Sequence, residues 1–221
     1  MVVQDNIIIL YKDEHLVVCQ KPSGLVCEEA GKDSLPFLLA KQLSESDGQK
    51  EFKLYPVHRL DKETVGIVVY ALTPTAASKL SEQIACGRWN KIYRALVCGE
   101  LTDDSGTFCD LLFYDRKRSR SYVVDRERKG VKDAKLEYKV ISREAASGCT
   151  EVEIKLYTGR THQIRVQFAS RKLPLCGDRR YGAPAELGNK LALCAVSLEL
   201  FHPITDEALH FEISPHWENR F

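Results

Sequence analysis

The chain has 221 residues, of which 44% are hydrophobic and 29% are charged, and this composition excludes an intrinsically disordered polyelectrolyte. Its length fits one large domain or two small lobes that share a core, and it is enough to fold without disulfides or a structural metal. The formal net charge is only +1, so a polyanionic partner would have to meet positive charge that is concentrated locally.

The cysteine pattern and the start of the chain bear on its compartment. The 8 cysteines form no C-x-x-C pair and are not spaced with histidines as zinc ligands usually are. Cys19, Cys98 and Cys194 lie in apolar runs, where a reduced thiol behaves as a small hydrophobic side chain. Residues 1–6 lack the basic start of a signal peptide, and no apolar stretch is long enough to span a membrane. We therefore expect a cytoplasmic protein without a bound metal and without a membrane partner.

The first part of the chain predicts a β-hairpin, a turn and a helix. Ile7–Leu10 and Leu16–Cys19 are short apolar runs separated by a polar segment, which is typical of two paired strands. Lys21–Gly24 (KPSG) predicts a turn. Leu35–Leu43 predicts a short helix with Ser34 as its N-cap.

A buried strand and a capped helix are predicted next. After a polar and mobile loop at Ser44–Lys50, the continuous apolar run Gly66–Leu72 has the length of a strand. Thr73 is placed to cap a helix that begins with Pro74, and Gly87 is placed to end it. The apolar residues of this helix recur at helical spacing and are Ala76, Ala77, Leu80 and Ile84.

The second half predicts further strands around one short helix. Tyr93–Cys98 is an apolar run of strand length, and Glu151–Tyr157 alternates charged and apolar residues, as a strand with one buried face does. Thr161 is predicted to cap a short helix that carries Ile164 and Phe168 on one side. Two closing strands are predicted at Leu191–Leu200 and Leu209–Ile213.

The order of these elements indicates the fold class. Strands outnumber helices and are not separated regularly by them, so the pattern favours an α+β fold with a largely antiparallel sheet over a doubly wound one. The sequence contains no internal repeat, low-complexity segment or clear linker. It therefore predicts a single domain over residues 1–221.

Four segments combine charged residues with a turn, a glycine or an adjacent strand. Taken alone, each is most simply a structural feature, namely a surface turn, an ordinary strand, a capped helix start and a glycine-bounded turn. Their sequences are HRLDKETVG (58–66), KIYRALVCG (91–99), GRTHQIRV (159–166) and CGDRRYG (176–182). Their occurrence together in this order is far more specific than any one of them.

Together these segments resemble the motifs of the RluA-type family of pseudouridine synthases, along nearly the whole chain. YKDEHLVV (11–18) and KPSG (21–24) resemble the opening strands and turn of that family, and HPITDEALHFE (202–212) resembles its closing segment. The resemblance implies the pseudouridine synthase fold, an α+β fold with a largely antiparallel mixed central sheet, flanking helices and a catalytic cleft. We also expect the chain to begin directly with the catalytic domain, without the small S4-like RNA-binding domain of many relatives.

The resemblance assigns roles to three residues. The implied reaction breaks the bond from the sugar carbon to N1 of uracil, turns the base and joins that carbon to C5, so neither metal nor cofactor is expected. Asp61 is implied as the carboxylate that attacks C1′ or removes a proton from C2′. Arg165 is implied as the partner that keeps it ionised away from water, and Tyr93 as a flat ring for the uracil. Val65 stands where the family usually has serine, which removes one hydroxyl group but not the carboxylate.

The expected partner is RNA, and the positive charge for it is gathered locally. Residues 116–135 form a strongly basic stretch between Phe113 and Leu136, which we expect to be a mobile hairpin that grips the RNA backbone. The family implies that Arg59, two residues from Asp61, fills the space left by a flipped base. The residues expected to contact RNA are His58, Arg59, Arg116, Arg118, Arg120, Lys129, Arg160 and His162.

Two other functions stay open. A glycosidase-like hydrolase would release uracil, but it would need a second carboxylate, and Glu63 is the acid nearest to Asp61 in sequence. The other alternative is an RNA-binding protein of the same fold without turnover, which the change at Val65 favours. The sequence is compatible with ribosomal or transfer RNA as the target, and a monomer is expected.

Overall fold

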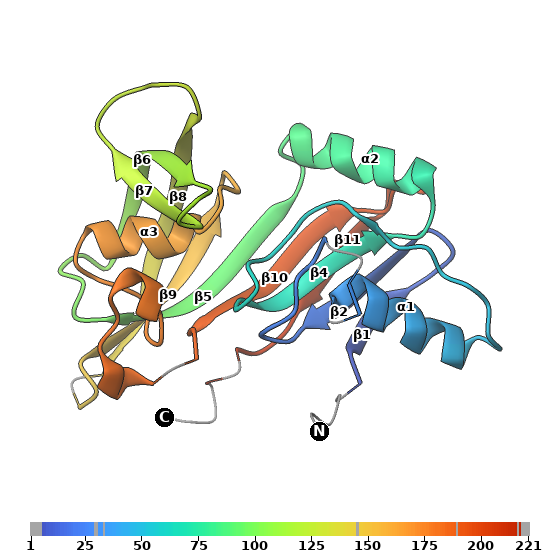
Figure 1. Cartoon of the computed structure of the whole chain (residues 1–221), viewed down its shortest axis with the longest axis horizontal. Helices are drawn as coiled ribbons and strands as arrows, with labels where there is room; N and C mark the ends of the chain where they lie inside the picture. Colours follow the sequence, from blue (N-terminus) through green and yellow to red (C-terminus); the bar gives the residue numbers. More distant parts are fainter. Residues whose placement is uncertain are drawn as a thin grey trace. The chain divides into compact units, whose positions relative to one another are not determined.

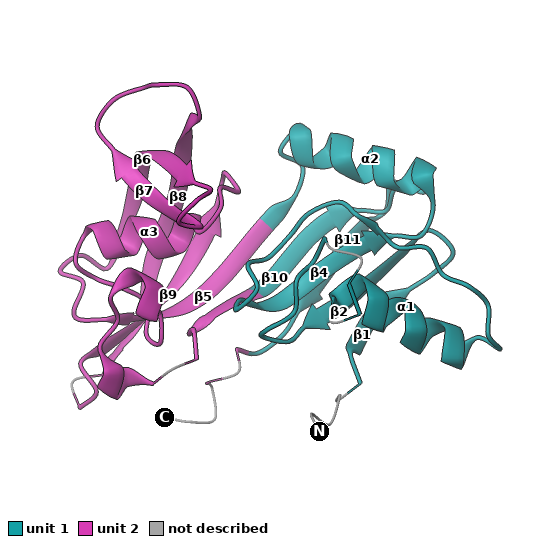
Figure 2. Cartoon of the chain, viewed as in Figure 1, with its two compact units in different colours: residues 1–90, 196–214 teal, residues 91–195, 215–221 magenta. Residues whose placement is uncertain are grey.

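The computed structural model describes residues 6–28, 31–32, 34–144, 146–188, 190–215 and 217. Residues 1–5, where the sequence predicts no signal segment, lie outside the described residues. The chain divides into two units, Met1–Asn90 with Val196–Ser214 (unit 1) and Lys91–Ala195 with Pro215–Phe221 (unit 2), which Figure 2 colours separately. Whether they act as the single domain expected over residues 1–221 stays a prediction.

Unit 1 is a sheet with two α-helices (Figure 1). Its strands follow the order β1-β2-β4-β10-β11, and β3 also pairs with β4. The pairings of β1 with β2, β2 with β4 and β10 with β11 are antiparallel, which confirms the predicted hairpin and the predicted closing strands. The elements are β1 (Ile8–Lys12), β2 (Leu16–Lys21), α1 (Leu35–Ser46), β3 (Tyr55–Pro56), β4 (Val65–Ala71), α2 (Pro74–Ala85), β10 (Leu193–Phe201) and β11 (Ala208–Glu212).

The core of unit 1 forms around β4, in which every residue is buried. Ala76 and Leu80 of α2 belong to the same apolar cluster as Ile67 and Val69 of β4, so α2 covers one face of the sheet. Helix α2 begins as predicted, with Pro74 in its first turn and the Thr73 hydroxyl accepting a backbone N–H. The apolar run in the sequence therefore predicted a strand that is covered on both faces.

Helix α1 is longer than the sequence predicts. Ser34 caps it as expected, but it continues to Ser46, so the loop predicted from Ser44 was wrong over its first three residues. The hydroxyl groups of Ser44 and Ser46 donate to the carbonyl oxygens of Ala40 and Gln42, at 2.9 and 2.7 Å. These bonds within the helix satisfy polar groups that otherwise favour a turn, and they allow a polar last turn.

Unit 2 is an antiparallel sheet in the order β5-β9-β8-β6-β7, with α3 packed against β6 and β7 (Figure 1). Val152 and Ile154 of β9 are buried, whereas Glu153 and Lys155 are exposed, which confirms the predicted alternation. The elements are β5 (Asn90–Cys98), β6 (Ser105–Asp115), β7 (Arg120–Val124), β8 (Val131–Glu144), β9 (Cys149–Leu156), α3 (Gln163–Ser170) and the 3₁₀ helices η1 (Arg179–Tyr181) and η2 (Ala185–Leu187).

The basic stretch predicted as a hairpin is part of this sheet. Strands β6 and β7 form a hairpin whose turn spans residues 116–119, and residues 125–130 connect β7 to β8. A hairpin over part of this stretch is confirmed, whereas its mobility and its contact with RNA stay predictions, and the long strands β6 and β8 on either side of it were not predicted. The apolar run of β6 is short, at residues 111–114, and in β8 the residues Leu136, Tyr138 and Val140 alternate with charged ones, a strand pattern that was not used in predicting the elements.

The predicted cap of α3 was wrong. The N-cap is His162, whose backbone is left-handed with φ 54°, and no side chain caps the helix there. The carbonyl of Thr161 instead accepts the Ser121 hydroxyl, so tertiary contacts fix this helix start. Ile164 and Phe168 are buried, as the spacing predicts.

The burial of the cysteines and the properties of the helices agree with the predictions from the sequence. Cys19, Cys98 and Cys194 are buried as free thiols, which confirms that they pack as small apolar side chains. Within the described part of the chain, no helix is long and apolar enough to cross a membrane.

The cap of α2 offers a direct test of how the local sequence stabilises the fold. The Thr73 Oγ1 atom accepts the Ala76 N–H at 3.2 Å. We expect Thr73→Ala to lower the free energy of unfolding by about 1 kcal/mol, measured by urea denaturation. Thr75→Ala removes an exposed threonine from the same turn and should change it by less than about 0.5 kcal/mol. Equal losses in both variants would show that the hydroxyl does not act as a cap.

Candidate active site

Asp61 lies in unit 1, in the loop that leads into β4. Its side chain is half-buried, and its carbonyl accepts the Thr64 N–H at 3.0 Å, which closes a tight turn. The preceding Leu60 is buried, and its N–H donates to Sγ of Cys27 at 3.4 Å. The loop around Asp61 is therefore fixed from both sides by backbone interactions.

Lys21 holds the part of this loop that follows Asp61. Its side chain is fully buried, and Nζ donates to the carbonyl oxygens of Pro22, Lys62 and Thr64, each at 2.8 Å. Burial lowers the pKa of the Lys21 ammonium to about 8. The KPSG segment was predicted only as a turn, so the role of Lys21 was missed. The signal was a lysine at the end of a buried strand, where an amine needs polar partners.

His58 and Arg59 differ in their surroundings. His58 Nε2 accepts the Val69 N–H at 2.9 Å, and its ring packs edge-on against Trp89, so this histidine takes part in the packing of unit 1. Arg59 is exposed and pairs with Glu28 through Nη1 and Oε2 at 2.5 Å. RNA contacts for both residues stay predictions.

Arg165 lies in unit 2, on α3, and forms a buried ion pair with Asp178. Nε and Nη2 donate to the two carboxylate oxygens at 2.6 and 2.8 Å, and the side chains are only 6% and 1% exposed. This is the two-pronged geometry in which guanidinium binds carboxylate most strongly. The pairing uses two of the five N–H donors of a guanidinium. Asp178 was not predicted, and the signal for it was an acidic residue beside glycine in CGDRRYG.

A glycine is required for the turn that presents Asp178. Gly177 has φ +75°, and a Cβ atom at this position would lie 2.0 Å from the carbonyl oxygen of Lys190. Any other side chain would displace the backbone by which Asp178 is held. The adjacent η1 helix then begins, and the N–H groups of Tyr181 and Ala183 donate to the Asp178 carbonyl.

Tyr181 contacts both Arg165 and residues of the basic hairpin. Its ring centre lies 5.2 Å from the Arg165 guanidinium and 4.8 Å from that of Arg120. Its hydroxyl accepts the Ser121 N–H at 2.8 Å and lies 3.0 Å from Nδ1 of His162. Burial raises the pKa of Tyr181, so the hydroxyl keeps its proton at neutral pH. Sequence reasoning missed this residue, although it is the aromatic member of CGDRRYG.

Tyr93 is a buried residue of β5 and pairs with Ile154 across the sheet. It belongs to unit 2, as Arg165 does, whereas Asp61 belongs to unit 1. The meeting of Asp61 with Arg165 and Tyr93 in one site therefore stays a prediction.

A basic groove of about 700 Å³ lies within unit 2 and carries two of the predicted RNA contacts, Arg116 and Arg160. Lys117 and Lys132 also line it, together with one carboxylate, that of Asp115. Two aromatic residues of β6, Phe113 and Tyr114, contribute to the lining. Four cations against one anion, beside aromatic rings, form a surface suited to nucleic-acid phosphates and unstacked bases.

The remaining predicted contacts lie outside the groove lining. Arg118 and Lys129 are exposed in the turns of the basic stretch, and Arg118 Nε lies 3.9 Å from a carboxylate oxygen of Asp115. Arg120 packs over Tyr181, as described above. His162 also contacts Tyr181. Arg120 and His162 therefore have contacts within unit 2 in addition to their predicted roles in RNA binding.

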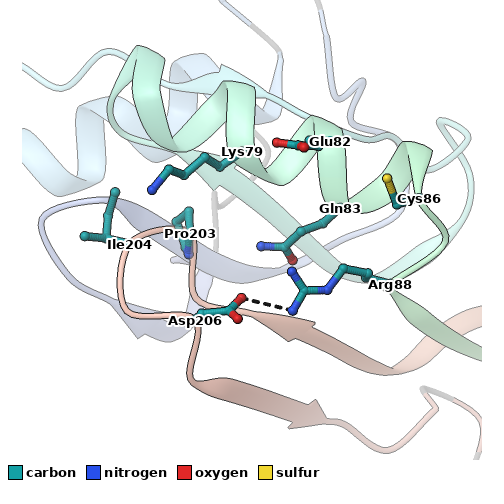
Figure 3. Close-up of a pocket in the computed structure, with 8 residues that line it drawn as sticks. All are labelled: Lys79, Glu82, Gln83, Cys86, Arg88, Pro203, Ile204 and Asp206. Carbon is teal, nitrogen blue, oxygen red and sulfur yellow. Dashed lines mark hydrogen bonds and ion pairs between the residues drawn. The ribbon is translucent and has the colours of Figure 1, made fainter.

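A second hollow, of about 290 Å³, lies in unit 1 between the end of α2 and the β10–β11 turn (Figure 3). Its lining has two cations, Lys79 and Arg88, and two carboxylates, Glu82 and Asp206. Arg88 donates to Asp206 at 3.0 Å, as Figure 3 shows. Its charges are balanced and partly paired with each other, so it suits a polyanion less well than the basic groove does.

The residues described contain no group of three or more His, Cys, Asp or Glu side chains arranged to hold a metal ion.

Comparison with known proteins identifies the family. The family described as RNA pseudouridylate synthase matches residues 15–170. YhcT of Bacillus subtilis, an uncharacterized RNA pseudouridine synthase, is 34% identical over 91% of this chain, which spans 66% of the length of that relative. The dual-specificity RNA pseudouridine synthase RluA of Yersinia pestis is 34% identical over 93% of this chain and 97% of its own length. The structure of human RNA pseudouridylate synthase domain containing 4 has a TM-score of 0.76 at 24% identity, over 94% of this chain and 88% of that one, which confirms the fold.

The buried ion pair generates a stability prediction. Asp178→Asn removes a counter-charge from Arg165, and we expect the free energy of unfolding to fall by about 3 kcal/mol in urea denaturation. The matched control is Asp110→Asn, because Asp110 also binds an arginine through both oxygens, but that partner, Arg171, is 33% exposed. Water can replace the lost partner there, so the loss should be about 1 kcal/mol. Losses of the same size in both variants would contradict the importance given to burial.

Proposed function

The chain belongs to the RluA-type family of RNA pseudouridine synthases, and from this premise we propose that it isomerises a specific uridine in ribosomal or transfer RNA to pseudouridine. The observation that carries the proposal is the alignment with nearly the whole length of the Yersinia relative, which is named as a dual-specificity RNA pseudouridine synthase. Asp61, Tyr93 and Arg165 occupy the motif positions that the proposed chemistry needs.

The proposed reaction depends on one ionised carboxylate beside the sugar of the target nucleotide. Asp61 would attack C1′ or take a proton from C2′, which frees the base to turn and to rejoin the sugar carbon through C5. Such a group must be held still, because a small misplacement is costly. The three hydrogen bonds from Lys21 and the turn closed by Thr64 support a fixed position for Asp61.

Arg165 is proposed to keep that carboxylate charged once water is excluded. Asp178 binds the Nε edge of the guanidinium, and the planar fork presents its remaining donors in another direction. Asp178 would thus orient Arg165 toward Asp61 and balance its charge in the absence of substrate. Tyr93 would supply a ring on which the uracil packs.

RNA binding is proposed to depend on the basic groove and on base flipping. Arg116, Lys117 and Lys132 would contact phosphate groups, since phosphate contacts supply most of the affinity and little of the specificity. Extruding the target uridine costs a few kcal/mol, and Arg59 is proposed to occupy the space it leaves. The exposure of Arg59 beside Glu28 supports this, because the ion pair is at the surface and can be exchanged for RNA contacts.

The two alternatives are less well supported. A hydrolase would need a second carboxylate, and Glu63 is exposed, with one carboxylate oxygen 3.2 Å from the Ser23 hydroxyl. A binding protein without turnover was favoured only by Val65. That side chain is buried at the start of β4, and the bonds by which Lys21 holds the loop go to main-chain oxygens.

The first test of the proposed function is the variant Asp61→Asn. We expect conversion of uridine in a stem-loop RNA to slow by about 10³-fold or more, because the carboxylate is lost while its volume is kept. The dissociation constant for RNA should change by less than about threefold, because phosphate contacts remain. Pseudouridine and free uracil are measured by nucleoside chromatography of the digested RNA.

The control for this test is Glu63→Gln, which removes an exposed carboxylate from the same loop and should leave the rate unchanged. Equal conversion by wild type and Asp61→Asn would remove Asp61 from the mechanism. Release of uracil by the wild type would favour the hydrolase, and RNA binding without either product would favour the non-enzymatic alternative.

The second test concerns the groove. Replacing Arg116, Lys117 and Lys132 by Gln should weaken RNA binding and reduce the slope of log K against log salt by about 2, since each phosphate contact contributes about 0.7 to 0.9. Replacing Arg118, Arg120 and Lys129 tests the residues expected from sequence in the same way. A matched control replaces Lys41, Lys50 and Lys79, which are exposed in unit 1. An equal slope in wild type and the groove variant would disprove the groove assignment.

A further inference from the structure

Three cysteines that the proposed reaction does not use come together inside unit 2. Sγ of Cys176 lies 3.4 Å from Sγ of Cys98 and 3.4 Å from Sγ of Cys149. All three are buried free thiols, and we call them the thiol cluster. These distances are at van der Waals contact, so little movement separates the thiols from a covalent bond.

The backbone places two members of the thiol cluster directly opposite each other. Cys98 of β5 and Cys149 of β9 are partners in the antiparallel ladder. The next pair, Gly99 and Gly148, is joined by an N–H···O bond of 2.8 Å, whereas the Cys98 N–H donates away from β9, to the Pro174 carbonyl. Cys98 and Cys149 therefore form a non-hydrogen-bonded pair, the kind in which side chains lie closest.

Cys176 joins this pair from a third segment. A β-bridge connects Val97 to Leu175, and the Cys176 N–H donates to the Leu96 carbonyl at 2.8 Å. The Cys176 carbonyl in turn accepts the Ala192 N–H at 2.9 Å. The backbone is thus held on both sides while the side chain contacts both neighbouring thiols.

The thiol cluster lies near solvent, and its members differ in pKa. Glu100 and Gly148, which flank it in sequence, are exposed. The hydrogen bond between the Cys98 and Cys176 thiols lowers the pKa of Cys98, whereas the same bond and burial raise the pKa of Cys176. Because thiolates react with peroxide and thiols do not, Cys98 is the member attacked first.

We infer that the thiol cluster is an oxidation site, at which hydrogen peroxide joins Cys176 to Cys98 in a disulfide. The Cys98 thiolate attacks peroxide, forms a sulfenic acid and releases hydroxide, and the Cys176 thiol then displaces water as the S–S bond forms. In total, two thiols lose two electrons and two protons, and peroxide becomes two water molecules. Cys149 can then attack Cys176 and return Cys98 to the reduced form, so the bond can move within the cluster.

The disulfide acts on the anchor of Arg165, and this step rests on the proposed function. Closing a 3.4 Å gap to a bond of about 2.05 Å moves the sulfurs about 1.4 Å closer. Only Gly177 separates Cys176 from Asp178, and it is packed against the Lys190 carbonyl. A shift of the Cys176 backbone therefore reaches the bonds of 2.6 and 2.8 Å that orient Arg165.

The test uses the full chain with Cys86→Ser and Cys109→Ser, because these exposed thiols would otherwise link separate molecules. The protein is reduced, treated with a small excess of peroxide, unfolded and alkylated, and linked peptides are identified by mass spectrometry without reductant. We expect two alkylatable thiols fewer per chain, Cys176 linked to Cys98 or Cys149, and full recovery with dithiothreitol. Uridine conversion by the oxidised protein should be about tenfold slower and recover equally, since a 1 Å misplacement can cost more than this.

Single variants in the same background show which cysteines of the thiol cluster form the disulfide. Cys149→Ala should keep the link between Cys98 and Cys176, Cys176→Ala should lose it, and Cys194→Ala, a buried thiol outside the cluster, should change nothing. If all three thiols remain fully alkylatable after peroxide, the cluster is not an oxidation site. This result is obtained without the single variants, so it does not depend on whether they fold. A disulfide with an unchanged rate overturns the coupling to Arg165. Thiol mapping needs no RNA and therefore tests the oxidation site by itself. A reduced protein that does not convert uridine would count against the proposed function but not against the oxidation site.

Discussion

The ion pair between Arg165 and Asp178 is the constraint on which the arrangement of unit 2 depends. A guanidinium that is 6% exposed costs several kcal/mol in desolvation unless its donors meet oxygen atoms in good geometry. That requirement accounts for a glycine at position 177, where only a bare backbone fits against the Lys190 carbonyl, and for the ring of Tyr181 against the guanidinium. The arginine that is proposed to act in catalysis lies on a short helix and is thus positioned by a turn that lies later in the chain.

In unit 1, a buried charged group is stabilised by hydrogen bonds to backbone atoms. Lys21 is buried and satisfies its three N–H bonds with carbonyl oxygens, two of which belong to the loop after Asp61. Because those acceptors are main-chain atoms, the side chain at position 65 can change from the serine usual in the family to valine while the loop keeps its anchor. The three hydrogen bonds offset the cost of burying the amine, and they also fix the loop that carries the neighbouring carboxylate.

Features that are determined by neighbouring residues could be predicted from the sequence, whereas contacts between distant segments could not. Thr73 and Pro74 begin α2 because a cap and a fixed φ act within one turn, so the prediction succeeded. Thr161 failed as a cap because His162 is held in a left-handed conformation beside Tyr181, a partner from another segment. Asp178 and Lys21 were missed for the same reason, since nothing near them in sequence shows which groups they bind. The motifs indicated candidate site residues, but not how those residues are held in place.

The distribution of charge shows why a nearly neutral chain can still suit RNA. The net charge is +1, yet the groove in unit 2 has four cations against one carboxylate, whereas the hollow in unit 1 has two of each. At physiological salt, exposed charges act over about 8 Å, so a nearly neutral protein attracts RNA little from afar. On the proposed function, affinity would then depend on phosphates that enter the groove itself.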